Sequence, residues 1–390
     1  MLRLAAIAVS LLWVSVQADA AGGIVCTPMP QAYKDYRELR DRVCEGDVDA
    51  AEKYMAQRQR DYEAGKIDER TLISSYLPFA TPISPAFFTN WLARYPDSYS
   101  AHVAAAGHQL ALGWQARGDK AARDTSKEDF ELMHRRFSAA RRYLERSISL
   151  TKKPTATYPM LINIGMHYGR TCTRRGSKLT PNPCQRDLLD KALEADPKAY
   201  WARRYYMDSV RPRWGGSFEA MEAFAGETQK ADLVDWQAKR FLAMVFEERA
   251  FFEQRPEEKL KLALQARELN YSVVNLHEII HALLLLERPK DVIPYATQYL
   301  ELAPATDWVL MRRGVAFWLL GKNAEAYEDF LAASKAGNAF SQNKVGYFLW
   351  TGTGVKQNQA EAVGWWQKAA ANGDKDGIKN LAHAKAQGFK

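Results

Sequence analysis

The sequence predicts an all-α fold, a right-handed superhelical solenoid of antiparallel helix pairs. Two segments with the same arrangement of small and aromatic residues begin at Val273 and Asp307, and 307 − 273 = 34 residues separate them. A fixed period of this size is typical of chains that stack one helix pair per repeat. The composition agrees, because 47% of the 390 residues are hydrophobic and 12% are aromatic, enough to fill the interfaces between helices.

The first twenty residues have the three parts of a secretory signal peptide. Arg3 gives a positive start, Leu4 to Val16 form an apolar core, and Ala18 to Ala20 provide a small-x-small cleavage site. The apolar core is shorter than the ~20 residues that span a bilayer, although an uncleaved anchor is the alternative. We therefore expect residues 1–20 to be removed, leaving a mature chain that is periplasmic or secreted and does not span the membrane.

The charge is mildly basic and spread along the chain, with Lys+Arg 54 against Asp+Glu 46 and a net charge of +8. No block of Lys and Arg with interleaved aromatic residues occurs, so we expect no nucleic acid partner. The excess charge either covers a solvated surface or favours an acidic protein, an anionic lipid or a cell-wall polymer.

Four cysteines in an exported chain suggest two disulfides. Among the three possible pairings, we expect the local one, Cys26 with Cys44 and Cys172 with Cys184. The second disulfide would close a loop rich in Gly, Pro and basic residues, which stabilises the fold by about 3 kcal/mol in the chain-entropy estimate. The spacings fit neither a metal site nor a redox-active CxxC motif.

Residues 21–216 are predicted to form an atypical helical region. Periodicity and breaking residues predict helices at Tyr33–Gly65 (two, separated at Gly46-Asp47), Phe87–Tyr95, Ser126–Leu150 and Gln185–Ala195. Pro212 and the pair Gly215-Gly216 then break the chain, and Ser217 is placed to cap the following helix.

Two short motifs in this region carry a family resemblance. GWQARG (Gly113 to Gly118) and PRWGGS (Pro212 to Ser217), together with WLARYPDSYSAH, resemble the bacterial family numbered four-zero-three-four among domains of unknown function. The resemblance covers roughly Tyr33 to Ala303. Members of that family often carry tetratricopeptide or Sel-one-like repeats, so the resemblance implies architecture and brings no activity.

The same motifs allow two interpretations of their aromatic and basic residues. Arg213 and Trp214, on a glycine turn, could stack on or pair with a bound partner. Alternatively, Trp214 fills the space between two helices and the glycines permit the tight turn. Trp114 and Arg117 have the same two interpretations.

Residues 217–337 are predicted to form tetratricopeptide-like repeats. In such repeats, positions 2, 5, 9 and 12 of the first helix line the groove that holds a partner. Carried over, these positions are Val274, His277, His281 and Leu284, then Trp308, Met311, Val315 and Trp318, with a weaker preceding repeat at Arg240, Ala243, Glu247 and Ala250. A Met/Trp-lined groove suits a helix or an extended peptide, unless these side chains simply pack on the neighbouring helix.

Residues 338–390 are predicted to form a Sel-one-like repeat followed by a capping helix. Ten residues stand where that family's motif expects them: Gly346, Gly352, Gly354, Val355, Ala362, Trp366, Lys368, Ala369, Ala370 and Gly373. The tail after Gly373 supplies one further helix, a suitable end for a solenoid.

One motif is compatible with catalysis. His277, Glu278 and His281 form HExxH, in which two histidines bind zinc and the glutamate activates its water, with Glu301 as a possible third ligand. However, Leu300 replaces the Asn expected before that ligand, and an all-helical chain lacks the edge strand that holds a peptidase substrate. We expect no metal, no cofactor and no enzymatic activity, with a zinc hydrolase as the alternative.

These observations predict an exported helical-repeat protein that binds a protein or peptide partner in the cell envelope, as a scaffold or adaptor. A second hypothesis is an immunity protein that neutralises a secreted toxin, as exported Sel-one-like proteins are known to do. The candidate partner-binding residues are His277, His281, Trp308, Met311, Trp318, Arg213 and Trp214.

Overall fold

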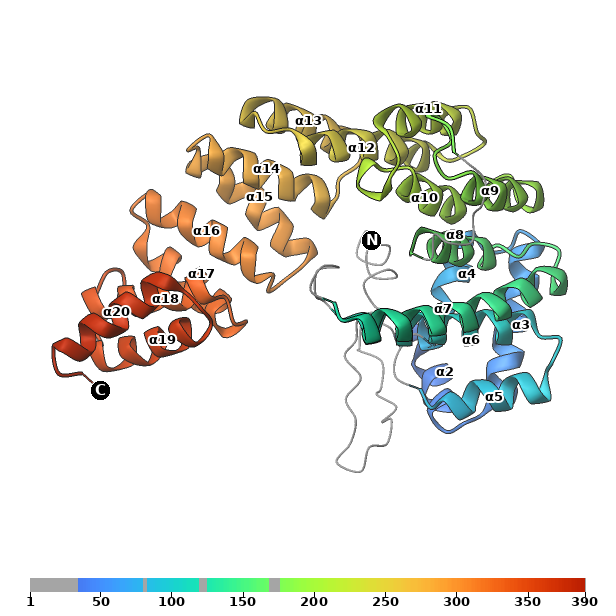
Figure 1. Cartoon of the computed structure of the whole chain (residues 1–390), viewed down its shortest axis with the longest axis horizontal. Helices are drawn as coiled ribbons and strands as arrows, with labels where there is room; N and C mark the ends of the chain where they lie inside the picture. The colour runs from blue at the N-terminus through green and yellow to red at the C-terminus, as the bar shows by residue number, and fades with distance from the viewer. Residues whose placement is uncertain (1–33, 80–82, 119–124, 168–175, 390) are drawn as a thin grey trace. The chain divides into compact units, whose positions relative to one another are not determined.

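The computed structural model describes residues 34–79, 83–118, 125–167 and 176–389 (Figure 1). These residues form 19 α-helices and contain no strand, so the all-α fold class is confirmed. The chain divides into two compact units, Met1–Ala238 and Lys239–Lys390, here called the N-terminal and C-terminal units. The domain limits expected at residues 216 and 337 stay predictions, and the signal peptide lies outside the described residues.

The N-terminal unit is built from helices and short 3₁₀ turns connected in sequence order. Their bounds are α2 Lys34–Cys44, α3 Val48–Glu63, α4 Glu69–Ser74, η3 Leu77–Phe79, α5 Pro85–Arg94, α6 Tyr99–Arg117, α7 Lys127–Ser147, η5 Ile148–Leu150, α8 Thr157–His167, α9 Pro183–Ala195, α10 Tyr200–Ser209, η7 Pro212–Trp214 and α11 Phe218–Gln229.

The helix ends in this unit follow the local sequence. The break expected at Gly46-Asp47 is present, where Gly46 has φ 84° and the side chain of Asp47 accepts from the backbone N–H of Ala50 at 2.9 Å. Ser126 and Ser217 cap α7 and α11 in the same way, by accepting from a backbone N–H three residues later. These caps satisfy donors that a helix end leaves without an intrahelical partner.

A cluster of aromatic rings forms the centre of the first helices. Trp91 is fully buried, with its ring 5.2 Å from that of Phe79 and 5.8 Å from that of Phe87. Its indole Nε1 donates to Glu52 at 2.8 Å, so the one polar atom of the ring is satisfied. Burial of such rings is the main stabilising term here.

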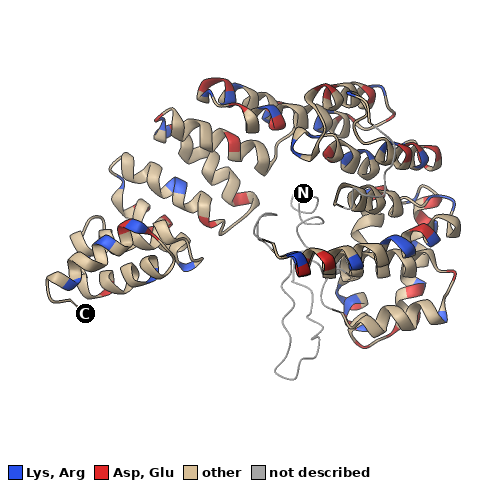
Figure 2. Ribbon diagram, viewed as in Figure 1, with Lys and Arg blue, Asp and Glu red and all other residues tan. Residues whose placement is uncertain are grey.

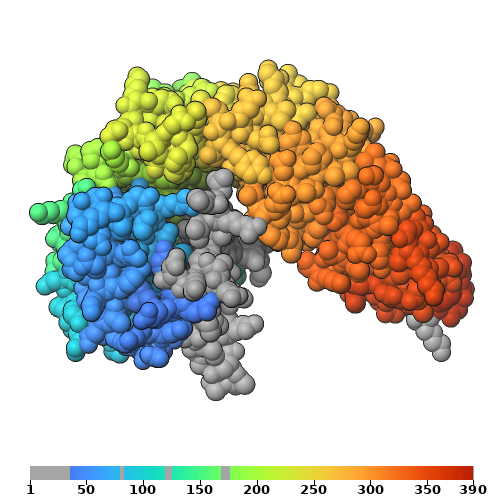
Figure 3. All heavy atoms as spheres, turned by 180° about the vertical axis from the view of Figure 1, so that it is seen from behind, coloured from blue at the N-terminus to red at the C-terminus, as the bar shows by residue number. Residues whose placement is uncertain are grey.

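In the C-terminal unit, the helices from Pro256 onward each pack on the next one in the chain. The colours of this unit accordingly follow one another from yellow to red in chain order (Figure 3). The helix bounds are α12 Asp235–Phe252, α13 Pro256–Leu269, α14 Val273–Leu285, α15 Pro289–Leu302, α16 Asp307–Leu319, α17 Asn323–Lys335, α18 Ala339–Thr351, α19 Gln359–Ala371 and α20 Lys375–Ala386, with the unit boundary falling inside α12. Helices begin at Val273 and Asp307, so the 34-residue frame is confirmed.

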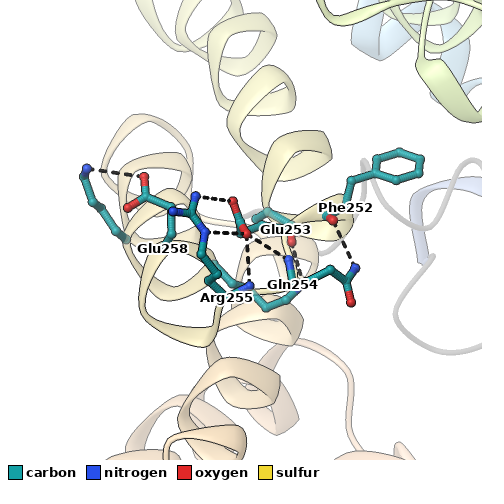
Figure 4. Close-up of polar contacts among 8 residues, drawn as sticks. Phe252, Glu253, Gln254, Arg255 and Glu258 are labelled. Atoms are coloured by element: carbon teal, nitrogen blue, oxygen red, sulfur yellow. Dashed lines mark hydrogen bonds and ion pairs between the residues drawn. The ribbon is translucent and has the colours of Figure 1, made fainter.

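The turn between α12 and α13 is held by Glu253 (Figure 4). Its carboxylate accepts from the backbone N–H of Arg255 at 3.0 Å and from the guanidinium of that residue at 3.1 and 3.0 Å. Gln254 donates from its side chain to the carbonyl of Phe252 at 3.1 Å. Hydrogen bonds from Arg255 lower the pKa of Glu253 to about 2, so the turn keeps its charge in neutral and mildly acidic solution.

In two of the helix pairs, α16 with α17 and α18 with α19, a glycine on the first helix faces a ring on the second. A Cβ added at Gly314 would lie 3.0 Å from the ring of Phe330, and one added at Gly346 would lie 2.5 Å from Nε1 of Trp366. That indole donates to the carbonyl of Asn343 at 3.2 Å, which fixes the ring against α18. The missing side chain is therefore what allows the helices to approach.

In the parts that the structure describes, no helix has the length and apolar character needed to cross a membrane. Basic and acidic side chains are both scattered over the helices of each unit (Figure 2). This agrees with the charge distribution expected from the sequence.

We predict that Gly346→Ala destabilises the C-terminal unit by about 1–3 kcal/mol, because the new methyl group overlaps Trp366. Hydrogen–deuterium exchange of α18 and α19 in the full chain measures this as a lower opening free energy. The matched control is Gly364→Ala in α19, where a Cβ meets nothing within 4 Å. The control should gain about 0.5–1 kcal/mol from helix propensity, and equal destabilisation by both changes would contradict the account.

Candidate functional site

The HExxH motif lies on α14, and its glutamate points into the protein. Glu278 pairs with Lys259 of α13 at 3.1 Å, and both side chains are almost completely buried. Lys259 also donates to the carbonyl of Ala250, and His277 Nδ1 lies 3.1 Å from the second carboxylate oxygen. Burial opposes ionisation of Glu278, but the contacts with His277 and Lys259 outweigh it and hold its pKa below the usual value.

In this arrangement the carboxylate of Glu278 stabilises the packing of α13 on α14 through its ion pair with Lys259. A general base must be free to reach a metal-bound water, whereas both oxygens of this carboxylate already have partners inside the fold. No group of three or more His, Cys, Asp or Glu side chains in the described residues could hold a metal ion, and Glu301 is exposed on α15.

The predicted groove positions of α14 and α16 carry a mixture of aliphatic, aromatic and histidine side chains. The ring of His277 lies 4.6 Å from that of Trp308, which in turn packs 5.0 Å from Tyr299. Val274 is 43% exposed, and the remaining positions, which are His277, His281, Leu284, Trp308, Met311, Val315 and Trp318, are half-buried. These side chains therefore both pack on neighbours and present part of their surface.

The surface continues onto α18, which the sequence analysis did not include. Phe340 and Tyr347 occupy positions 2 and 9 of that helix and are 38% and 40% exposed. The ring of Tyr347 lies 6.3 Å from that of Trp318. Applying the same four positions to α18 would have found both residues. We call the surface formed by these positions on α14, α16 and α18 the first-helix face.

Two cations lie on aromatic rings of the first-helix face. Lys344 Nζ is 4.3 Å from the ring centre of Trp318 and 5.0 Å from that of Phe340, and the guanidinium of Arg312 is 5.8 Å from Trp308. Burial lowers the pKa of both groups, so their charge is partly removed from water.

Neither cation forms an ion pair with a carboxylate among the described residues. The adjacent Arg313 behaves differently, because it makes a two-pronged ion pair with Asp329 at 2.8 Å. Nε of Arg312 is buried without any hydrogen-bond acceptor. Burial and the nearby Arg312 also lower the pKa of His281, which is therefore neutral at pH 7.

The expected continuation of the groove onto α12 does not occur. Arg240, Ala243, Glu247 and Ala250 are all buried, and Arg240 pairs with Glu247 at 2.7 Å. Ser272 Oγ donates to the same carboxylate at 2.9 Å, so these residues join α12 to the start of α14. The first-helix face therefore begins at α14.

The N-terminal unit brings its two tryptophan motifs together at one pocket. Trp114 of GWQARG lies 4.6 Å from the ring of His167, and His167 lies 5.2 Å from Trp214 of PRWGGS. Arg117 lies 5.6 Å from the ring centre of Trp114. The pocket has a volume of about 690 Å³ and lies among α6, α7, α8, α10 and η7. Sequence reasoning missed His167, since nothing local marks it.

Glycines set the geometry of both motifs. A Cβ at Gly113 would lie 2.7 Å from the ring of Phe137, so this glycine lets α6 approach α7. A Cβ at Gly216 would lie 1.9 Å from the carbonyl oxygen of Val210, and Gly215 has φ 84°. The resulting turn places Trp214 at the pocket, whereas Arg213 is exposed and does not line it.

Two of the four cysteines lie in the described residues. Cys44 is the last residue of α2, and Cys184 is the second residue of α9. Cys26 and Cys172 lie outside the described residues. The expected pairing stays a prediction.

Comparison with known proteins gives a match at the C-terminus. The Sel1 repeat family model matches residues 339–374, which confirms the Sel-one-like repeat.

Two solved structures resemble the chain. One is a Sel1 repeat protein from Oxalobacter formigenes, with 17% identity, 96% of this chain and 98% of that chain covered, and a TM-score of 0.43. The other is c5321, a protective antigen of uropathogenic Escherichia coli with an SLR fold, with 13% identity, coverages of 99% and 87%, and a TM-score of 0.43. The resemblance of the N-terminal region to the family of unknown function stays a prediction.

We predict that Lys259→Met destabilises the C-terminal unit by about 3–5 kcal/mol, because it leaves Glu278 charged and buried. Adding Glu278→Met should recover part of the loss. Opening free energies of α13 and α14 from hydrogen–deuterium exchange measure both effects. If Lys259→Met alone lowers the opening free energy by less than about 1 kcal/mol, the carboxylate of Glu278 reaches solvent and could act as a general base, which would contradict the account.

Proposed function

We propose that the protein is an exported adaptor that binds a segment of an envelope protein through the first-helix face. The segment combines acidic residues with aromatic or aliphatic ones. The observation that carries the proposal is the pair of half-buried cations, Arg312 and Lys344, which lie on half-buried tryptophan rings and form no ion pair with a carboxylate of the described residues. A complex at this face is stabilised when the partner supplies apolar groups that cover the rings and negative charge that pairs with the cations.

The apolar part of the face suits a protein ligand. Trp, Tyr and Arg are the residues that contribute most to binding energy at protein interfaces. His277 lies on α14, Trp308 and Trp318 lie on α16, and Tyr347 lies on α18, so a segment lying across the three helices would meet a ring on each. Their stiff rings lose little conformational entropy when covered.

The charge of the face selects the partner. A carboxylate that approaches Lys344 or Arg312 meets a cation already partly stripped of water, which makes the attraction stronger than at an open surface. An equally apolar but basic segment would leave both cations unpaired and add repulsion. We therefore assign the acidic class of partner over the neutral and basic classes.

Location in the envelope is part of this proposal and rests on the signal-like residues 1–20. The scaffold and toxin-neutralising hypotheses both use a protein-binding surface. Of the hypotheses from the sequence, the zinc hydrolase is the one that the position of Glu278 disfavours, because its carboxylate is engaged by Lys259.

The test is selection of a random peptide library on the chain without residues 1–20. We expect enriched peptides to combine Asp or Glu with aromatic or aliphatic residues. Lys344→Glu should weaken their binding at least about tenfold, a loss of about 1.4 kcal/mol. Trp318→Ala should weaken it as well, because the ring is both contact surface and support for Lys344.

The chain offers a matched control for Lys344. Lys368 lies 4.1 Å from the ring centre of Trp365, the same chemical pair, but on the second helix α19. Lys368→Glu should leave peptide affinity unchanged. Selection of basic or purely neutral peptides, or equal losses for the two Lys→Glu variants, would contradict the proposal.

A further inference from the structure

The pocket of the N-terminal unit is large enough for a small molecule. Its volume of about 690 Å³ lies inside the range of about 300–1,000 Å³ that is usual for ligand sites. The wall is mostly apolar, with tryptophans from α6, α10 and η7 and methionines from α7 and α8; these are Trp114, Trp201, Trp214, Met133, Met160 and Met166. Methionine side chains adapt to irregular ligands, and tryptophans offer broad apolar surfaces.

Among the described residues, one cation of the pocket wall, Arg117, has no ion pair. Asp208 lines the pocket but is already ion-paired, with Arg211 at 3.0 Å and with Arg204. Arg117 lines it too, and among the described residues its guanidinium has only the cation–π contact with Trp114. The wall therefore carries a positive charge that no carboxylate of the described residues pairs with.

Three further polar groups of the wall have no hydrogen-bond partner in the described chain: the side chains of Asn163, His167 and Tyr205. His167 is neutral at pH 7, since burial and the charge of Arg117 lower its pKa to about 4. Its ring therefore adds a donor and an acceptor without adding charge. Polar groups in an otherwise apolar pocket are the usual means of orienting a ligand.

We propose that this pocket binds a small amphipathic carboxylate, with its apolar body between Trp114, Trp214 and the methionines and its carboxylate on Arg117. The guanidinium matches a carboxylate in charge and geometry, and the two can form parallel hydrogen bonds. The site is separate from the first-helix face, so the inference does not rest on the proposed adaptor function.

Two sources share this ligand chemistry, a fatty acid and an aromatic acid. The structure favours neither, because methionines suit a flexible acyl chain and tryptophans suit a flat ring. Dodecanoate and 1-naphthaleneacetate are therefore the two probes, and dodecanol is the neutral counterpart of the first. Binding of either acid supports the proposal and identifies the source.

The experiment is isothermal titration of the chain without residues 1–20, with each probe below its micelle concentration. We expect saturable binding of at least one acid at one site per chain. Dodecanol should bind at least about tenfold more weakly than dodecanoate if the fatty acid is the ligand. Arg117→Gln should reduce affinity for the acid at least about tenfold, and Arg117→Lys should restore part of it.

The control variant is Arg135→Gln, an exposed arginine of α7 that does not line the pocket. Its affinity for the acid should equal that of the unchanged chain. Failure of both acids to bind would overturn the proposal, as would binding that Arg117→Gln leaves unchanged. A circular dichroism spectrum of each variant establishes that the helices remain folded. Trp214→Ala, which also changes the pocket wall, supplies a second variant that should weaken binding.

Discussion

The close approach of a first helix to its second helix is the constraint on which the C-terminal unit depends. In two pairs a glycine on the first helix faces a ring on the second, at Gly314 with Phe330 and at Gly346 with Trp366, whereas α14 has the fully buried Ile280 at the equivalent position. Fully buried rings and alanines then contribute to the interfaces between the helices. Ring contacts between His277 and Trp308 and between Trp318 and Tyr347 join α14 to α16 and α16 to α18, so the side chains at these positions form a single face.

Buried ion pairs determine which polar residues of this unit are available for function. Glu278 and Lys259 neutralise each other between α13 and α14, and Arg313 is held by Asp329. Such pairs are costly to break once formed, because either partner alone would be a buried charge. What remains on the first-helix face is positive charge over aromatic rings, which is the chemical basis of the preference for acidic partners.

The sequence predicted those features that depend on local spacing. Features that depend on a few neighbouring residues or on a fixed repeat length were predictable. They are the starts of α14 and α16, the caps at Ser126 and Ser217, and the Sel1 repeat at residues 339–374. Phe340 and Tyr347 were accessible to the same reasoning. The partner of Glu278 lies 19 residues away on another helix, and His167 joins two motifs from distant segments, so tertiary packing alone reveals them.

The most direct test of partner binding at the first-helix face is site-specific photo-cross-linking in cells that produce the full chain. A photoreactive phenylalanine analogue would replace Tyr347 on that face, or Gln367, which is exposed on the second helix α19. The account predicts one cross-linked envelope protein at Tyr347, none at Gln367, and loss of the product when a selected acidic peptide is added. Equal cross-linking at both positions, or a product that the peptide does not displace, would contradict it.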